Sequence, residues 1–289
     1  MKTYKCNYWA KMLAVTLTAP QLKGTFKMKS KLLILSALVA LAGFLPQSKA
    51  ALTLGSAASF GVLGGSTVTS TGNTVVNGNV GLYPGTSITG FGPGIVNGTI
   101  YNNNAVAQQA QADALTAYNI LAGEPVFHDL TGQDLGTLIL APGVYFFSSS
   151  AQLTKTLTLS GNGLYDFQIG STLTTAAGAP SNPGSSVVLT GGAQACQVFW
   201  QVGSSATIGT YSDFVGNILA LTSITANTGA TVDGRLLALN GAVTLDDNLI
   251  SVPICVPVPE ASSFWPGAFC ASVFGWQWLG VWRRKTARS

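Results

Sequence analysis

The sequence predicts a mainly β protein, a three-sided β-solenoid with one long α-helix packed alongside. In several segments small apolar and hydroxyl residues alternate with period two, which is typical of strands with one dry and one wet side. The clearest segments repeat at intervals of 18 and 19 residues, from Thr207 to Thr225 and from Thr225 to Thr244. Because a coil of this length cannot bury its own apolar side, neighbouring coils must stack.

The repeats define columns of residues on the predicted stack. Four segments align without a gap: 165–178, 196–212, 213–229 and 232–248. The outward columns read Thr174, Thr207, Thr225 and Thr244, and, two residues earlier, Thr172, Ser205, Ser223 and Ala242. The inward column between them reads Leu173, Ala206, Ile224 and Val243. A weaker alignment adds Thr69 from 59–72 and Thr154 from 148–157 to the outward side, so we expect a flat surface of Thr and Ser with little charge.

One helix is predicted over residues 103–122, between the two weakly aligned segments 59–72 and 148–157. Asn103 or Asn104 can cap its start, and Gly123 followed by Glu124-Pro125 ends it. An amphipathic helix in a β protein must lie along an apolar side of the stack. We expect the residues against the stack to be Val106, Ala110, Leu115, Tyr118, Leu121 and Ala122, with Gln108, Gln111 and Asn119 elsewhere.

Composition excludes a nucleic-acid partner. Only 8% of the 289 residues are charged, and 34 are glycine. Between Ala51 and Val258, two basic residues (Lys155 and Arg235) stand against nine acidic ones, which gives this stretch a net charge of −7. The excess of basic residues therefore lies at the two ends, and the body has no basic patch that could displace counterions from phosphates. We predict one solenoid domain over 51–252.

Residues 1–50 read as a leader with a secretory signal peptide. A basic segment at 28–31 precedes the apolar run 32–45, and small residues at Ser48 and Ala50 suit cleavage after Ala50. Residues 1–27 match no signal pattern. Translation therefore starts either at Met28 or upstream with an unusually long basic region.

The C-terminal end reads as a linker and sorting motif at 253–263, followed by a transmembrane helix and basic tail at 264–289. An apolar run from Phe264 to Trp282 is just long enough to span a bilayer, and Arg283, Arg284 and Lys285 follow it. Val-Pro-Glu-Ala at 258–261 before this run resembles the PEP-CTERM sorting signal, although Ala261 replaces the second proline and Pro266 and Gln277 interrupt the helix. The resemblance implies cleavage near Glu260 and delivery outside the cell, with an exopolysaccharide matrix as a candidate partner; the alternative is an ordinary tail anchor. Both predict a secreted or cell-surface protein that is at least transiently anchored in the membrane.

The sequence predicts no enzyme, no cofactor and no metal site. The acidic residues are scattered, Asp246-Asp247 lies at a predicted turn, and His128 has no nucleophile motif around it. Cys196 and Cys255 are the two cysteines of the exported body, with no spacing typical of zinc. In an oxidising compartment they either form a disulfide or remain as buried thiols.

The body resembles the microbial ice-binding (antifreeze) proteins. The stretches that carry the resemblance are 54–72, 84–100, 129–136, 141–154, 167–176 and 193–248. The resemblance implies a discontinuous right-handed β-solenoid with one helix alongside, and ice with its ordered water as the partner. In this family a Thr-Ala/Gly-x-Thr/Asn pattern marks part of the binding surface; Thr225-Ala226-Asn227-Thr228 matches it, and Thr207 and Thr210 match its two threonines. The predicted ice-binding residues are therefore Thr69, Thr154, Thr172, Thr174, Ser205, Thr207, Thr210, Ser223, Thr225, Asn227, Thr228 and Thr244.

A second hypothesis has the same fold and no ice activity. A flat surface of Thr and Ser could also bind glycans or cell-surface partners, as in a non-catalytic matrix or adhesion protein. Aromatic platforms would favour glycans, but the repeat pattern places Phe199 and Trp200 in a strand that is mostly core. Substitution of outward threonines separates the two hypotheses.

Overall fold

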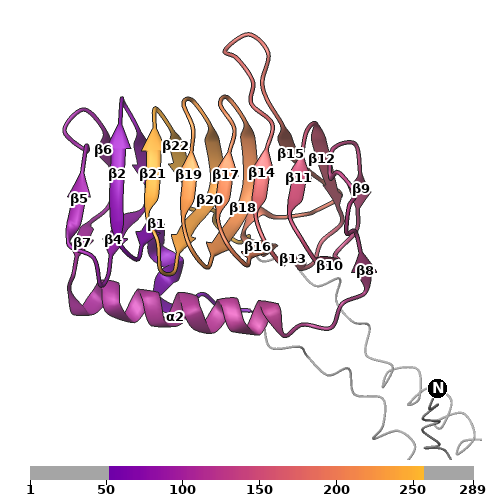
Figure 1. Ribbon diagram of the computed structural model, residues 1–289, viewed down its shortest axis with the longest axis horizontal. Coiled ribbons are helices and arrows are strands. Elements are labelled where there is room, and N and C mark those ends of the chain that lie inside the picture. Colours follow the sequence, from indigo (N-terminus) through magenta and orange to yellow (C-terminus); the bar gives the residue numbers. More distant parts are fainter. Residues whose placement is uncertain (1–51, 257–289) are drawn as a thin grey trace, which may run out of the picture. The chain divides into compact units, whose positions relative to one another are not determined.

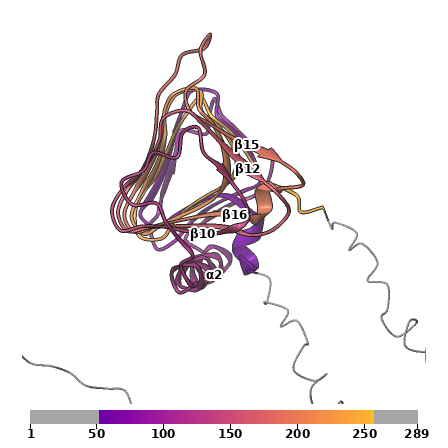
Figure 2. The same ribbon diagram turned by 90° about the vertical axis from the view of Figure 1, so that its right-hand side faces the viewer.

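The computed structural model describes residues 52–256, which form a triangular solenoid of stacked parallel strands with one helix beneath it (Figures 1 and 2). The predicted signal peptide, sorting motif and membrane span lie outside this range. Within it, no helix is both long and apolar enough to cross a bilayer. Parallel sheets with a single helix alongside confirm the predicted fold class.

The first side of the triangle is a separate seven-stranded sheet, which we call the threonine face. Its strands stand in the front row of Figure 1. In spatial order they are β11 (Ala151–Leu153), β14 (Leu173–Thr175), β17 (Ala206–Ile208), β19 (Ile224–Ala226), β21 (Val243–Asp246), β2 (Thr67–Thr71) and β5 (Ser87–Thr89).

The second side carries the helix, and we call it the helix face. Its strands are β8 (His128–Asp129), β10 (Gly143–Phe147), β13 (Tyr165–Ile169), β16 (Val198–Val202), the later halves of β18 (Asp213–Ala220) and β20 (Thr231–Ala238), β1 (Phe60–Gly64), β4 (Asn79–Leu82) and β7 (Ile100–Asn102). The 3-10 helices η2 (Gly55–Ser59) and η3 (Ala195–Gln197) precede β1 and β16.

The remaining side, which we call the third face, is uncovered like the threonine face. It contains β9 (Ile139–Leu140), β12 (Thr156–Ser160), β15 (Ser186–Thr190), the first halves of β18 and β20, β22 (Leu249–Ser251), β3 (Val75–Asn77) and β6 (Ile95–Val96). An inserted loop at 178–184 lies between β14 and β15 and is closed by an antiparallel bridge from Ala179 to Asn182.

The solenoid is discontinuous, because the first coils stack on the last one. β2 pairs with β21, and β3 pairs with β22, so the indigo start of the described chain lies beside its yellow end in Figure 1. From there the chain coils outward to β7, and the helix α2 (Ala105–Ala122) carries it back along the stack to β8. Eighteen residues of helix extend about 27 Å, which matches five to six coils spaced about 4.8 Å apart.

The helix packs through a narrow stripe of small residues. Asn104 caps it, since its Oδ1 accepts a hydrogen bond from the Ala107 amide at 3.0 Å. The buried positions are Ala107, Ala110, Gln111, Ala114, Ala117, Tyr118 and Leu121. Val106 and Leu115, which we expected against the stack, are 45% and 46% exposed, and Ala122 is exposed as well. The stripe of alanines brings the helix close to the sheet, and larger side chains would hold it away.

The interior is apolar and contains an aromatic stack. The inward column of Leu173, Ala206, Ile224, Val243 and Val68 is at most 1% exposed. On the inner side of the helix face, Tyr145, Phe167 and Trp200 stack with ring centroids 5.3 and 4.0 Å apart. Trp200 and Phe199 are buried, as predicted, so neither offers a platform to a glycan.

Candidate functional site

The threonine face carries one continuous outward column along its whole length. Direct pairing places Thr174 beside Thr207, Thr207 beside Thr225, and Thr225 beside Thr244. The column continues through Thr69 to Thr89, a residue that the sequence alignment missed. We call these residues the central column: Thr174, Thr207, Thr225, Thr244, Thr69 and Thr89, with Gln152 at the β11 end.

The alignment of Thr154 with this column is wrong by two residues. Gln152 pairs with Thr174, and Thr154 follows the end of β11. There its hydroxyl donates to Asp134 Oδ2 at 2.6 Å, and its amide donates to Asp134 Oδ1 at 3.1 Å. Thr154 therefore fixes a loop of the terminal coil and lies outside the central column.

The geometry of the central column suits an extended, regular binding surface. Neighbouring strands lie about 4.8 Å apart, and alternate residues along a strand about 6.7 Å apart. Threonine is β-branched and stiff at χ1, so its methyl and hydroxyl groups hold fixed positions. Within residues 52–256, none of the six threonine hydroxyls of the column makes a hydrogen bond to protein. These hydroxyls are therefore available to ordered water.

The neighbouring column behaves differently. Thr172 donates to Ser150 Oγ at 2.8 Å, and the oxygens of Ser205 and Ser223 accept from the amides of Ser223 and Ala242 at 3.3 and 3.2 Å. These hydroxyls link one coil to the next. Of the predicted site residues, Thr172, Ser205 and Ser223 thus mainly hold neighbouring coils in register beside the central column.

At the edge toward the third face, hydroxyls are tied to a carboxylate or a carbonyl. Asp246 accepts hydrogen bonds from Thr71, at 2.7 Å, and from Thr228. These hydrogen bonds hold the pKa of Asp246 below its ordinary value, and the bond from Thr228 contributes most. Thr210 donates to the Gly178 carbonyl at 2.8 Å, below the inserted loop. In the segment 225–228, Thr225 therefore lies in the central column, whereas Thr228 is bonded to Asp246 at the edge of the face.

The residues weighed for catalysis have structural contacts. The exposed ring of His128 stacks on Tyr145 with centroids 5.1 Å apart, at the end of the aromatic stack. Asp247 Oδ1 accepts from the Asn73 amide at 2.6 Å and so joins the last coil to the first. Among residues 52–256, no group of three or more His, Cys, Asp or Glu side chains could hold a metal.

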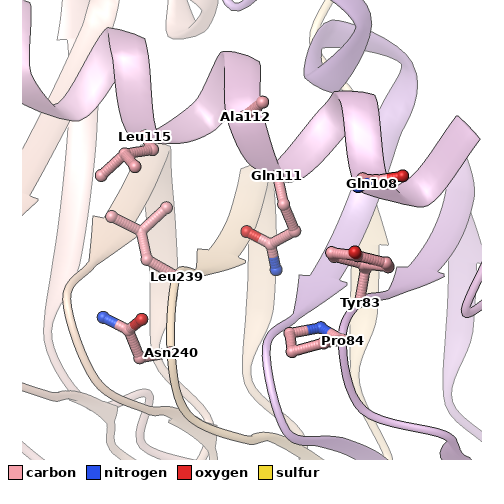
Figure 3. Close-up of a pocket in the computed structure, with 8 residues that line it drawn as sticks. All are labelled: Tyr83, Pro84, Gln108, Gln111, Ala112, Leu115, Leu239 and Asn240. Atoms are coloured by element: carbon pink, nitrogen blue, oxygen red, sulfur yellow. The ribbon is translucent and has the colours of Figure 1, made fainter. Parts of the chain in front are cut away.

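A hollow of about 320 Å³ lies between α2 and the corner of the stack (Figure 3). Its lining residues are Tyr83, Pro84, Gln108, Gln111, Ala112, Leu115, Leu239 and Asn240, none of them charged. Gln111, which we expected away from the stack, points into the corner and donates to the carbonyls of Gly64 and Ala238 at 2.7 and 3.1 Å. The amide satisfies backbone groups that the helix covers, so it is part of the fold.

Known proteins share this architecture. Residues 62–251 match the family model described as ice-binding-like. The chain belongs to this family. An ice-binding protein of Nostoc sp. (strain HG1) is 53% identical over 247 residues, which cover 83% of this chain and 89% of that protein. An ice-binding protein of Colwellia sp. is 37% identical over 220 residues, 70% of this chain and 84% of the relative.

Solved structures agree with the family assignment. The crystal structure of an ice-binding protein from an Antarctic biological consortium has a TM-score of 0.67 and 46% identity, and the match covers 71% of this chain and 93% of that one. The ice-binding protein of the Antarctic ascomycete Antarctomyces psychrotrophicus gives a TM-score of 0.66 at 44% identity, covering 70% and 98% of the two chains. At these identities, the resemblance extends beyond the fold to the sequence of the coils.

Proposed function

We propose that the protein binds ice through the central column of the threonine face and thereby inhibits ice growth and recrystallisation. The single observation that carries the proposal is the column itself, six stacked threonines whose hydroxyls have no protein partner within residues 52–256. The family and its relatives named as ice-binding proteins support the same function.

The mechanism follows from the stiffness and spacing of the column. Hydroxyls anchor water by hydrogen bonds, while the methyl groups beside them order the water between anchors. Since the side chains are already held in place, little conformational entropy is lost when this water joins an ice plane. The protein supplies a surface and performs no chemical step.

We also propose that the protein acts outside the cytoplasm. The bond between Cys196 and Cys255 supports this, because disulfides persist in oxidising compartments. The apparent signal peptide and the apolar C-terminal run point the same way.

The test is to watch a single ice crystal in a solution of the purified protein. We expect faceted crystals, thermal hysteresis and slower recrystallisation than in albumin. Thr207→Tyr and Thr225→Tyr should abolish these effects because a bulky ring interrupts the column. Val188→Tyr is the matched control, since Val188 is an exposed position of the third face and this change should leave ice shaping intact.

Two results would contradict the proposal. If activity survives both threonine changes, the binding surface lies elsewhere. If the unmodified protein gives round, freely growing crystals, the alternative of a matrix or adhesion protein becomes the better one.

A further inference from the structure

The chain enters and leaves the solenoid at the same vertex of the triangle, opposite the threonine face. η2 leads into β1 there, and residues 252–256 follow β22 to the same place (Figure 2). Leu52, Leu54, Pro253 and Cys255 line one hollow of about 370 Å³ at this vertex. We call η2, η3 and residues 252–256 the attachment vertex. Anything joined to the chain beyond residue 256 is therefore connected to the side of the solenoid away from the central column.

The C-terminal coil lies in the middle of the stack. β22 is paired with β20 on one side and β3 on the other, and β21 lies between β19 and β2. A pull on residue 256 would act first on β22, which is only three residues long. Loss of β22 from the sheet would remove the contact between β20 and β3 on the third face and leave the first coils held by the β1–β20 and β2–β21 pairs alone.

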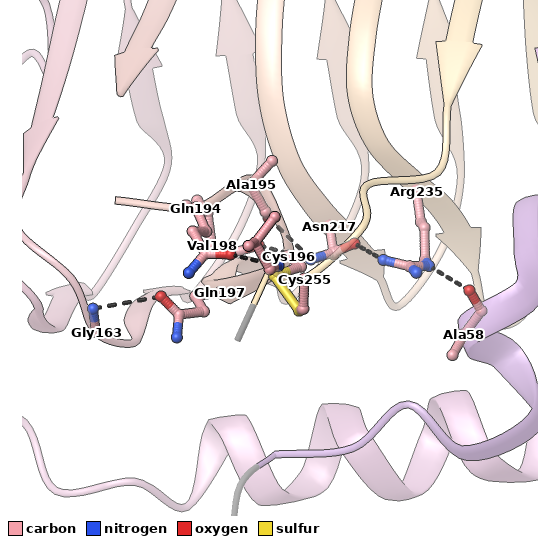
Figure 4. Close-up of a disulfide and its surroundings, with 11 residues drawn as sticks. Ala58, Gly163, Gln194, Ala195, Cys196, Gln197, Val198, Asn217, Arg235 and Cys255 are labelled. Carbon is pink, nitrogen blue, oxygen red and sulfur yellow. Dashed lines mark hydrogen bonds between the residues drawn. A yellow bond between two sulfur atoms is a disulfide. The ribbon is translucent and has the colours of Figure 1, made fainter. Parts of the chain in front are cut away.

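A covalent bond at the attachment vertex diverts this force from β22. Cys255 is bonded to Cys196 in η3, with 5.6 Å between their Cα atoms (Figure 4). Next to it the Val256 amide donates to Gln194 Oε1 at 2.8 Å. Tension arriving at residue 256 therefore passes to η3 and β16, which is paired on both sides with β13 and β18.

Buried polar contacts spread the load from η3 to its neighbours. Asn217 of β18 donates to the carbonyls of Ala195 and Val198 at 3.4 and 2.9 Å. Arg235 of β20 donates to Asn217 Oδ1 at 2.7 Å and to the Ala58 carbonyl of η2 at 2.8 Å. Arg235 is 7% exposed. Burial lowers its pKa to about 10, so it remains protonated at neutral pH. The disulfide is thus linked to β16, β18, β20 and η2.

We propose that the attachment vertex is a force-bearing anchor, by which a cell or matrix joined to the C-terminal side of the chain holds on to ice. The inference rests on the proposed function and extends it from inhibition of ice growth to adhesion. Its partner is a solid support on the C-terminal side and an ice surface on the threonine face. The disulfide carries the tension past β22.

The test uses the full chain coupled to beads through its C-terminal end, with ice adhesion measured under increasing flow. We expect beads with the intact disulfide to remain on ice, and beads with Cys196→Ser/Cys255→Ser to lose most of their adhesion under flow. The matched control couples the same two proteins through the N-terminal end. Tension then enters through η2, so the serine changes should have little effect.

The readouts separate failure of this inference from failure of the proposed function. Ice shaping by the free double variant at the same temperature shows that it is folded without load. Equal adhesion of the two C-terminally coupled proteins would overturn the load path. Failure of C-terminally coupled beads to adhere, while the free protein shapes ice, would overturn the orientation. If the free wild-type protein does not shape ice, the proposed function itself is wrong.

Discussion

The threonine face and the third face belong to the same coils and differ in what they present to solvent. Both are stacks of short parallel strands, and neither is covered by α2. On the threonine face, pairing places six threonines in one column. The corresponding column of the third face reads Thr156, Ser186, Asp213, Thr231, Leu249, Val75 and Ile95.

Hydroxyl groups of the third face are also bonded within the protein. Thr231 donates to Asp213 Oδ1 at 2.7 Å, and the hydroxyls of Thr156 and Ser186 lie 2.9 Å apart. Leu249 and Ile95 expose large aliphatic side chains in the same column. Stacking alone therefore does not make a face regular. If the proposed function is correct, binding to ice requires outward side chains that are uniform, uncharged and not bonded to one another.

The largest expected effect on stability comes from substitutions in the interior, because the strands of both faces bury apolar side chains there. Ile224 lies behind the threonine face and Ile250 behind the third face, and both are fully buried. Ile224→Asp and Ile250→Asp should each cost more than about 5 kcal/mol, enough to unfold a typical domain. Circular dichroism and thermal unfolding measure this loss. A cooperative transition in either variant would show that the core tolerates a charge and that coils behind the two faces are not equally packed.

Removal of the disulfide should act on stability and leave the threonine face unchanged. Cys196 and Cys255 are separated by 59 residues, and closing a loop of this length stabilises by about 4 kcal/mol in the chain-entropy model. Urea unfolding of Cys196→Ser/Cys255→Ser measures the difference. The folded variant should still shape ice, since the bond lies at the opposite vertex. If the folded variant did not shape ice, the disulfide at the attachment vertex would have to influence the geometry of the threonine face, and the faces could not be compared independently of that vertex.

The sequence was sufficient to predict the coils whose lengths agree. Thr207, Thr225 and Thr244 pair as their spacing indicates, because β18 and β20 each run as one continuous strand from the third face to the helix face. The coil from Gln152 to Thr174 is longer by the four residues 161–164 between β12 and β13. Turns can take in extra residues without moving the strands, so spacing alone misplaced Thr154.

The order of the coils could not be predicted from periodicity. Thr69 was assigned to the outward column, but its position beside Thr244 depends on contacts between residues more than 170 apart. All coils present similar edges, so period-two alternation does not show which edge pairs with which. The hydrogen bonds that the Thr71 hydroxyl donates to Asp246 and the Asn73 amide donates to Asp247 select this junction, and these partners are apparent only in the fold.

A smaller effect is expected at the edge between the two faces. The hydroxyls of Thr228 and Thr71 lower the pKa of Asp246 from 3.8, so its charged form stabilises the fold above that pH. This contribution is lost as pH falls below about 4 and Asp246 becomes protonated. Asp246→Asn should reduce stability at pH 7 by about 0.5 kcal/mol, since solvent screens the site, and should flatten this acid dependence. Urea unfolding of the two proteins at pH 7, 4 and 3 measures both the loss of stability and its pH dependence. If stability falls with pH equally in the variant, the acid dependence comes from other carboxylates.

The smallest expected effect on stability separates the two chemical groups of threonine. Thr225→Val removes the hydroxyl and keeps the branched shape, whereas Thr225→Ser removes the methyl and keeps the hydroxyl. Each change should alter stability by less than about 0.5 kcal/mol, because the side chain contacts solvent. We expect each to reduce thermal hysteresis in part, and less than Thr225→Tyr does.

Val188→Thr on the third face is the control, because it introduces a threonine at an exposed position whose column contains Thr158 and Ile139 in place of further stacked threonines. It should leave ice activity unchanged. Full activity of Thr225→Val would mean that the hydroxyls do not anchor the water, and full activity of Thr225→Ser would remove the role of the methyl groups. Reduced activity in both would support a surface in which neither group is sufficient alone. In that case, the threonine face differs from the third face because each of its six stacked threonines supplies both a hydroxyl and a methyl group.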